Sequence, residues 1–336
     1  MSHSFILSRR VLRFRAFAFS ACIVALAACD SSDSLNPDTS LPEGVELETP
    51  ADPISSIEED TPLEEDGTQQ LAPAGEPVLA SVSFAGGIPM GTYAQPTSTF
   101  GERYNGGLRN IWPESLTREL AAIKSRGGKV VLMFAGNEQY YRDAAGKFSL
   151  TKWKARVDRF RNVNFSSYVS DGTIVAHYLI DEPNDPANWA GTPVSASTVE
   201  QMAQYSKQLW PGMLTVVRVD PGYLRSDHRY LDAAWAQYVY RKGAASDYIR
   251  RNVADAQSRG LGLITGLNVL KGGPNGAKMT AEQVKTWGST LLGSSYPCAF
   301  ISWQYNDTYL SGTSMRSAMD ALRNKAENRS MRSCRG

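Results

Sequence analysis

Two adjacent carboxylates, Asp181 and Glu182, follow an apolar run and precede Pro183. The run, residues 173–180, reads as one buried strand, because Gly172 and Pro183 bound it and proline has no N–H to donate to a sheet. Carboxylates just past the C-terminal end of a parallel strand lie where α/β enzymes keep their chemistry. Two like charges side by side raise the pKa of one of them, so that one group keeps a proton. The pair is therefore a candidate for acid–base catalysis; the alternative is that Asp181 caps the next segment and Glu182 is solvated.

The domain that must position these groups reads as eight strands alternating with helices over residues 77–329. This length and alternation predict parallel pairing, right-handed crossovers and an α/β (β/α)8 TIM barrel, with residues 330–336 as a tail. The expected strands are 79–84, 107–111, 129–135, 173–180, 214–219, 234–240, 261–268 and 299–304. The expected helices are 113–126, 150–160, 199–209, 246–259, 281–292 and 314–324. A doubly wound open sheet is the rival, and the lack of a glycine-rich phosphate loop after the first strand argues against nucleotide binding.

Polar and aromatic side chains recur at the expected C-terminal ends of these strands, which would surround one pocket in a barrel. Carboxylates and amides bind hydroxyls, and aromatic faces stack on pyranose rings, so this composition indicates a carbohydrate site. The candidates for a second catalytic carboxylate beside Glu182 are Glu138 and Asp220, while Trp303 and Tyr305 would form the sugar platform. Asn137 and Asn268 would bind hydroxyls, Arg109 would hold an anionic substituent, and Gln304 and Asp307 complete the rim.

The motif Asp181-Glu182-Pro183 after the fourth strand, together with Trp303 at the end of the eighth, resembles the clan A glycoside hydrolases. In those barrels an Asn-Glu-Pro-like motif carries the acid/base glutamate, and an aromatic residue ends the eighth strand. The resemblance implies a glycoside hydrolase acting on an oligo- or polysaccharide, with Glu182 as general acid. Asp181 replaces the usual asparagine, and residues 266–268 (Gly-Leu-Asn) stand where the clan has its nucleophilic glutamate. A non-catalytic carbohydrate-binding lipoprotein on a degenerate barrel is the alternative, and retaining and inverting chemistry both stay open.

Other chemistries lack the residues that they need. His177 and His228 are the only histidines after the N-terminal signal, and two separated imidazoles cannot supply a multi-histidine metal site, so we expect no metal and no cofactor. We expect His177, inside the fourth strand, to be a satisfied interior residue. The sequence has no Gly-x-Ser-x-Gly elbow, which argues against a serine hydrolase.

The first 28 residues read as an export signal. Four arginines precede a short apolar stretch, residues 16–28, that is too short to span a bilayer stably. The Leu-Ala-Ala-Cys sequence at 26–29 resembles the lipobox of bacterial lipoproteins, which implies that Cys29 is lipidated. We therefore expect a protein anchored by lipid to the bacterial cell envelope, at its inner or outer membrane, where nucleic-acid binding does not fit.

Residues 29–76 carry 14 acids and no Lys or Arg, lack apolar periodicity, and read as a disordered acidic tether. Of the chain's 35 Lys and Arg and 34 Asp and Glu, four bases lie in the signal and these 14 acids in the tether. The domain keeps 31 bases and 20 acids, a net charge of +11. Such a domain favours anionic partners, so an acidic polysaccharide, a structural role on an anionic envelope polymer, and a basic surface without a specific partner are open alternatives.

The four cysteines divide by their place in the chain. Cys22 leaves with the signal and Cys29 takes the lipid, so Cys298 and Cys334 remain as an even pair in an oxidising compartment. In a barrel the eighth strand begins and the last helix ends at the same rim, so we expect these two cysteines to form a disulfide. The chain is expected to act as a monomer.

Overall fold

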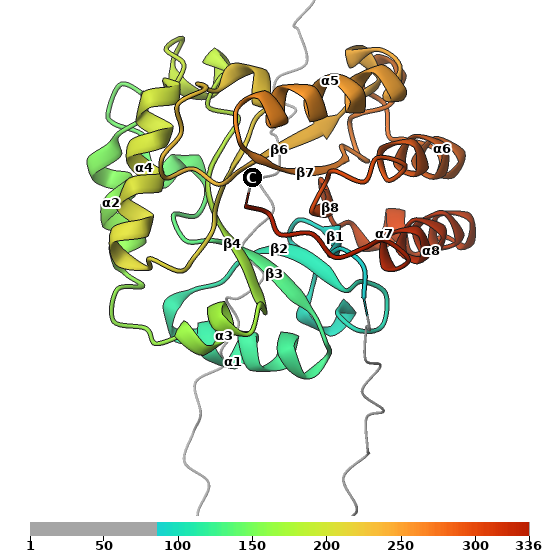
Figure 1. The fold of residues 1–336 in the computed structure, drawn as a ribbon, viewed down its shortest axis with the longest axis horizontal. Helices are drawn as coiled ribbons and strands as arrows, with labels where there is room; N and C mark the ends of the chain where they lie inside the picture. Colours follow the sequence, from blue (N-terminus) through green and yellow to red (C-terminus); the bar gives the residue numbers. More distant parts are fainter. Residues whose placement is uncertain (1–85, 336) are drawn as a thin grey trace, which may run out of the picture. The chain divides into compact units, whose positions relative to one another are not determined.

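Eight parallel strands form one sheet that runs around a ring in the order β1-β8-β7-β6-β5-β4-β3-β2 (Figure 1). The strands are β1 (Met90–Thr92), β2 (Gly106–Asn110), β3 (Lys129–Met133), β4 (Ile174–Asp181), β5 (Thr215–Arg218), β6 (Ala233–Tyr238), β7 (Gly262–Leu267) and β8 (Ala299–Ser302). The structure, a computed structural model, describes residues 86–335. A parallel bridge between Tyr93 and Leu108 joins β1 to β2, so the predicted (β/α)8 barrel is confirmed.

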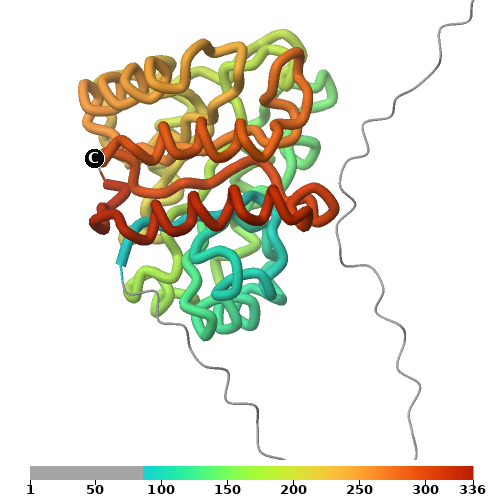
Figure 2. The backbone as a smooth tube through the Cα atoms, turned by 90° about the vertical axis from the view of Figure 1, so that its right-hand side faces the viewer, coloured from blue at the N-terminus to red at the C-terminus, as the bar shows by residue number. Residues whose placement is uncertain are grey.

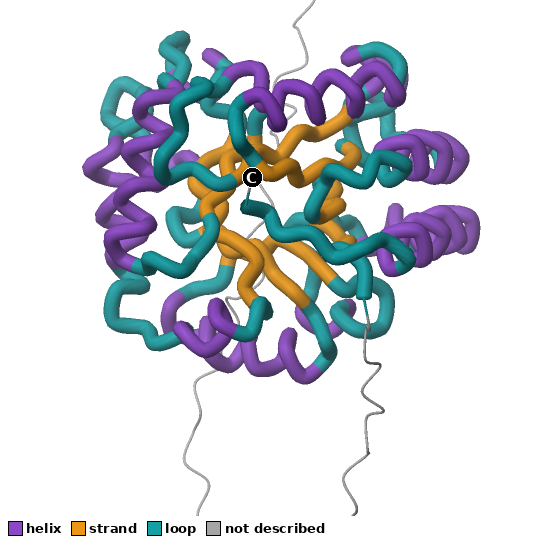
Figure 3. The backbone as a smooth tube through the Cα atoms, in the orientation of Figure 1, coloured by secondary structure: helices purple, strands orange, loops and turns teal. Residues whose placement is uncertain are grey.

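Helices link the strands and form an outer ring around them (Figure 3). They are α1 (Pro113–Ser125), α2 (Leu150–Asp158), α3 (Ser166–Ser170), α4 (Ala196–Leu209), α5 (Ala245–Ser258), α6 (Ala281–Leu291), α7 (Asp307–Leu310) and α8 (Thr313–Glu327). The six predicted helices are present within three residues at each end, whereas α3 and α7 are too short to produce a helical period in the sequence. Within residues 86–335, no helix is both long enough and apolar enough to cross a membrane.

Helices α6 and α8 lie side by side along one flank of the barrel (Figure 2). Helix α6 begins with a capping box, in which Thr280 accepts from the Gln283 backbone and Gln283 accepts from that of Thr280. A Cβ at Gly288 would lie 2.6 Å from a methyl carbon of Leu322 in α8. The glycine therefore lets the two helices approach closely at the point where the ring of strands closes.

The first strand differs from the prediction. The expected strand 79–84 lies outside the described residues, and Met90–Thr92 fills the position between β8 and β2. A Cβ at Gly91 would lie 1.9 Å from the carbonyl oxygen of Gly106, so β1 needs this glycine to approach β2. The glycines and proline around β1 lack the β-branched pattern of a strand and read as a loop, which explains the error.

Apolar side chains fill the inside of the barrel, and the filling becomes polar toward the C-terminal ends of the strands. The apolar part is formed by Tyr93, Leu108, Val131, Met133, Ala176, Tyr178, Val216, Ala233, Trp235, Ile264, Ala299 and Ile301, with both Cys298 and Cys334. Because side chains two residues apart share a strand face, Arg218 on β5 and Gln237 on β6 continue this interior column and are also buried. The sequence therefore places a buried polar layer directly under the end of the barrel at which the strands finish, which is called the mouth below.

Cys298 and Cys334 form the expected disulfide, with their Cα atoms 5.1 Å apart. Both side chains are buried in the interior cluster, so the C-terminal tail lies over the end of the barrel where the strands begin (Figure 1). A Cβ at Gly262, the first residue of β7, would lie 2.3 Å from the carbonyl oxygen of Cys334. The glycine makes room for the tail, and the disulfide holds the tail against β8.

Replacing both Cys298 and Cys334 by serine should lower the free energy of unfolding by about 3–4 kcal/mol. The bond links positions 36 residues apart, and its loss returns that loop's freedom to the unfolded chain. Urea unfolding with and without a reductant measures the effect. Reductant should destabilise the wild type and leave the double serine variant unchanged; a wild type indifferent to reductant would contradict the stabilising role.

Candidate functional site

A bulge at the end of β4 turns Asp181 into the barrel. Ala176 and Tyr178 point inward, and strict alternation would place Ile180 next, but the register of β4 against β5 shifts between Tyr178 and Asp181. Ile180 joins the outer apolar layer, and Asp181 pairs with Arg218 across the ladder. Bulges of this kind re-aim side chains at the rims of barrels. The local break in the strand is thus what delivers a carboxylate to the mouth.

Glu182 directly follows β4; two hydrogen bonds hold its backbone, and its carboxyl lies at the surface of the mouth. Its φ is +33°, an uncommon value for a residue with a side chain. Its N–H donates to the carbonyl of Arg218 at 3.0 Å, and its own carbonyl accepts from Trp189 Nε1 at 3.2 Å. The side chain of Glu182 is 44% exposed, whereas that of Asp181 is 11% exposed. Of the two adjacent acids, Glu182 is therefore the one that a substrate can reach.

Arg218 joins the two acids from below. Its guanidinium donates to Asp181 Oδ1 at 2.5 Å and to Glu182 Oε1 at 3.2 Å, and it also hydrogen-bonds Gln237. The guanidinium carbon lies 4.4 Å from the centre of the Trp303 ring. Asp181, Glu182 and Arg218 form the acid cluster, in which one buried cation serves two carboxylates, so the cluster has a net negative charge when both acids are ionised.

This charge arrangement favours a proton on Glu182. Burial raises the pKa of the Glu182 carboxyl, the Arg218 guanidinium opposes that rise, and the neighbouring charge of Asp181 adds to it, so that the pKa stays above its ordinary value. Burial likewise raises the pKa of the Asp181 carboxyl against the opposing effect of Arg218. Burial lowers the pKa of the Arg218 guanidinium, but the charges of Asp181 and Glu182 outweigh it and hold the pKa above its ordinary value, so this group stays charged. Glu182 is the exposed acid with a raised pKa, as a general acid requires.

The two candidates for a second carboxylate differ in their partners. Asp220 accepts hydrogen bonds from Lys242 Nζ at 2.9 Å and from the Tyr248 hydroxyl at 2.9 Å. Glu138 follows β3 in a short turn, half-buried, and its charge raises the pKa of Asp181. Within residues 86–335, no hydrogen bond or ion pair engages the Glu138 carboxylate. Of the two carboxylates, that of Glu138 is therefore the one without a side-chain partner in the described part of the chain.

Trp303 lies at the mouth but is already packed. Its ring stacks on Tyr93 with centroids 4.3 Å apart and an angle of 9° between the planes. With Arg218 over the same ring, these contacts use indole surface that a sugar would otherwise cover. Trp303 therefore holds Arg218 in place at least as much as it offers a platform.

The remaining rim candidates lie on the loops above the strands. The Tyr305 hydroxyl donates to Asp307 Oδ1 at 2.8 Å, and Asp307 is exposed beside Arg103. Asn268 Oδ1 accepts from the Lys271 backbone at 3.0 Å and so shapes the turn after β7. Asn137 precedes the turn that carries Glu138, and Gln304 follows Trp303; both are half-buried. Asn137 is thus the amide directly before Glu138 in the chain.

Arg109 points away from the barrel axis. Its guanidinium donates to the carbonyl of Gln95 at 3.0 Å and to the Thr97 hydroxyl at 2.7 Å, and it lies 3.6 Å from Glu119 in α1. Leu108, its neighbour on β2, is the residue that faces the interior. Arg109 therefore ties the loop after β1 to α1, and the structure does not bring it to the acid cluster.

His177 is the interior residue that was expected, but only one of its ring nitrogens is satisfied, because its buried Nε2 has no hydrogen-bond partner. Its Nδ1 lies 2.8 Å from the Ser206 hydroxyl of α4, and its ring stacks with that of Trp153. Burial lowers the pKa of His177 to about 3, so the imidazole is neutral at physiological pH. Within residues 86–335, no group of three or more His, Cys, Asp or Glu side chains is arranged to hold a metal ion.

Sequence reasoning missed Arg218, Gln237 and Tyr93. A signal existed for the first two, because Arg218 interrupts the apolar run of β5 and Gln237 that of β6. A buried ionisable or amide group in a strand needs a hydrogen-bond or ionic partner. Tyr93 gave no such signal, since its strand was placed elsewhere.

No protein-family model and no curated protein matches the chain. Solved structures resemble it at low identity. A GH18 chitinase from Pseudoalteromonas aurantia has 13% identity and a TM-score of 0.45, over 69% of this chain and 99% of the other. Saccharomyces cerevisiae Gas2p in complex with laminaritetraose and laminaripentaose has 11% identity and a TM-score of 0.45, over 71% and 58%. Xylanase10C from Cellvibrio japonicus in complex with xylopentaose has 8% identity and a TM-score of 0.46, over 74% and 69%.

Likeness of this extent carries no argument about catalysis. The fold of this chain rests on its own strand order and register, and its chemistry rests on the residues at the mouth.

Proposed function

We propose that the chain is an exported, lipid-anchored glycoside hydrolase that acts on an oligo- or polysaccharide. The observation that carries the proposal is Glu182: a half-exposed acid with a raised pKa, held at the mouth of a (β/α)8 barrel over Arg218. Export and anchoring come from the N-terminal signal and Cys29, which lie outside the described residues. The substrate class follows from the carboxylates, amides and aromatic side chains around that mouth.

In the proposed reaction Glu182 donates its proton to the glycosidic oxygen while the bond from that oxygen to the anomeric carbon breaks. Glu138 either attacks the anomeric carbon or takes a proton from the water that does, and water finally supplies the new hydroxyl. In its ionised form, paired with Arg218, Asp181 opposes the loss of the Glu182 proton between turnovers. Asp220 is less suited to the role of Glu138, because Lys242 and Tyr248 already engage it.

A carbohydrate-binding protein without turnover is the second candidate. The observation that favours it is the end of β7, where Gly266 and Leu267 provide no carboxylate. A Cβ at Gly266 would lie 1.8 Å from the carbonyl oxygen of Ile301, so this position cannot carry a side chain without moving β8. Binding of saccharides with no release of reducing ends by the wild type would favour this candidate.

Comparison of Glu138→Gln with Asp220→Asn tests the assignment of the second carboxylate. Glu138→Gln should lower kcat by about 10²-fold, because its carboxylate is the nucleophile or base, and Asp220→Asn should have a smaller effect. Reducing-end release from laminarin, xylan and chitin oligomers measures the rates, and NMR of the first product anomer separates retention from inversion. A larger loss in Asp220→Asn than in Glu138→Gln would reverse the assignment.

A further inference from the structure

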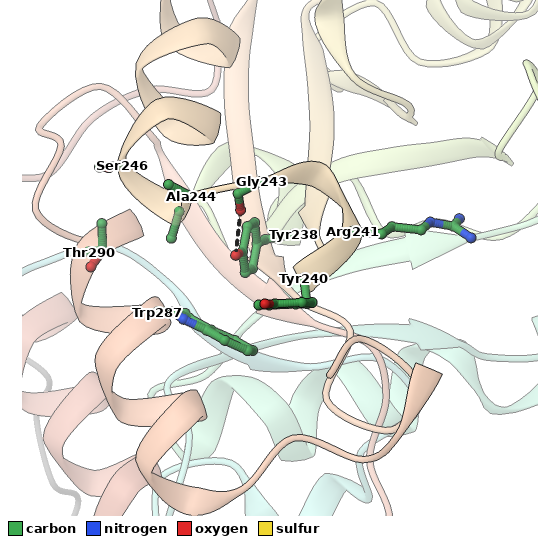
Figure 4. Close-up of a pocket in the computed structure, with 9 residues that line it drawn as sticks. Tyr238, Tyr240, Arg241, Gly243, Ala244, Ser246, Trp287 and Thr290 are labelled. Carbon is green, nitrogen blue, oxygen red and sulfur yellow. Dashed lines mark hydrogen bonds between the residues drawn. The ribbon is translucent and has the colours of Figure 1, made fainter. Parts of the chain in front are cut away.

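A cavity of about 590 Å³ lies outside the ring of strands, between the start of α5 and the middle of α6 (Figure 4). It is lined by Tyr238, Tyr240, Arg241, Gly243, Ala244, Ala245, Ser246, Trp287 and Thr290. None of these residues belongs to the acid cluster of the mouth. The cavity is therefore a second hollow with its own chemistry.

Stacked aromatic rings form one wall of this cavity. Tyr240 and Trp287 lie with centroids 5.8 Å apart and planes at 29°, and Tyr238 meets Trp287 edge-on at 5.5 Å. Tyr238 is held there by its hydroxyl, which donates to the carbonyl of Gly243 at 2.8 Å (Figure 4). Tyr240 is 51% exposed, and within residues 86–335 only Met331 joins it as an exposed large apolar side chain. A rigid aromatic surface is thus open to solvent beside a hollow, as stacking on a pyranose ring requires.

The opposite wall is the N-terminal end of α5, and it carries positive character. Ala244 at the N-cap has no side-chain oxygen, so no side chain caps the first turn, and Ser246 of that turn lines the cavity. Asp247, the acid of the same turn, pairs with Arg250 at 2.9 Å. Arg241 also lines the cavity, but its guanidinium extends away from the aromatic pair (Figure 4). The hollow therefore joins an aromatic surface to the backbone N–H donors and the positive dipole end of α5.

We propose that this cavity is a second saccharide-binding site, selective for a chain that carries carboxylate or ester sulfate groups. A sugar ring would lie on Tyr240 and Trp287, with its anionic group toward the start of α5. The charge is complementary at a larger scale as well, because the domain carries 31 Lys and Arg against 20 Asp and Glu. This site does not depend on the hydrolysis proposed for Glu182.

The cavity also adjoins the mouth. The turn Tyr240–Lys242 carries Tyr240 on the cavity side, and its last residue, Lys242, binds Asp220 on the mouth side. A long acidic chain held at the cavity would therefore be kept close to the acid cluster, which raises its effective concentration there.

Binding to the full chain carrying Glu182→Gln tests the site without turnover. The probes are tetragalacturonate, tetramannuronate and a heparin tetrasaccharide, with cellotetraose as the neutral comparison, titrated by calorimetry. Tyr240→Ala and Trp287→Ala should each raise the Kd for an acidic probe about tenfold, equivalent to about 1.4 kcal/mol. Trp287→Phe should keep most of the affinity because it keeps a ring. Met331→Ala, an exposed apolar change outside the cavity, should leave the Kd unchanged.

Three results would overturn the site. The first is that none of the three acidic probes binds, or that cellotetraose binds as tightly as they do. The second is that Trp303→Ala at the mouth abolishes all binding while Trp287→Ala, folded by circular dichroism, leaves it intact. The third is a dimer in sedimentation that Trp287→Ala dissolves, which would assign the aromatic surface to self-association. Since every variant carries Glu182→Gln, failure of the hydrolysis proposal leaves this test unaffected.

Discussion

Glu182→Gln should lower kcat on a cleavable saccharide by about 10²–10⁴-fold and leave saccharide binding largely intact. Glutamine keeps the shape and the hydrogen bond to Arg218 but has no proton of suitable acidity for the leaving oxygen. Release of reducing ends gives the rate, and calorimetry with the same saccharide gives the affinity. The matched control is Glu282→Gln, an exposed change of the same chemistry in α6, which should keep the wild-type rate.

The pH dependence provides a second test of the same role. A general acid acts in its protonated form, so kcat of the wild type should fall as pH rises through the pKa of Glu182, which burial and Asp181 hold above its ordinary value. A wild-type rate in Glu182→Gln, or a wild-type kcat that increases through that range, would refute the assignment of Glu182 as general acid.

Arg218→Met should lower the free energy of unfolding by about 3–5 kcal/mol. Methionine occupies similar space, but its introduction leaves the buried Asp181 carboxylate without its cation. Burial already holds the folded-state pKa of Asp181 above its ordinary value, and loss of Arg218 raises it further, so the deficit should be smallest in acid. The deficit should grow as pH rises from the folded-state pKa of the wild type toward the higher one of the variant. Urea unfolding at several pH values measures both effects.

Two further variants control for the loss of a charge as such. Arg250→Met removes an arginine whose side chain is 78% exposed and paired with Asp247, and should cost less than about 1 kcal/mol. Arg218→Met combined with Asp181→Leu removes both buried charges and should recover most of the lost stability. If Arg218→Met costs no more than Arg250→Met, the buried pair does not stabilise the fold.

Six of the eight strands were predictable because they contain apolar runs bounded by glycine, proline or polar residues, and β2 was predicted from a weaker pattern. Lys129–Met133 and Gly262–Leu267 are such runs, and each lies within the predicted limits. β1 was not predictable, since its three residues owe their strand conformation to β8 and β2 on either side rather than to local propensity. Non-local pairing of this kind leaves little trace in a single sequence.

The candidate site was predictable where it depended on chain order and not where it depended on side-chain direction. Asp181 and Glu182 follow a strand, so their position at the mouth could be read directly. The opposite directions of Leu108 and Arg109 depend on the face that β2 turns inward, and the turn of Asp181 depends on a bulge. Neither feature is visible in residue types alone.

The ring of strands closes late in the chain, and this has a consequence for the biogenesis of the protein. β1 pairs with β8, Met90 opposite Phe300, and the disulfide joins Cys298 to Cys334. A chain that stops short of residue 299 leaves one edge of β1 and one edge of β7 without a partner, and such edges invite aggregation and proteolysis. Pairing of β8 with both β7 and β1 therefore protects these two edges.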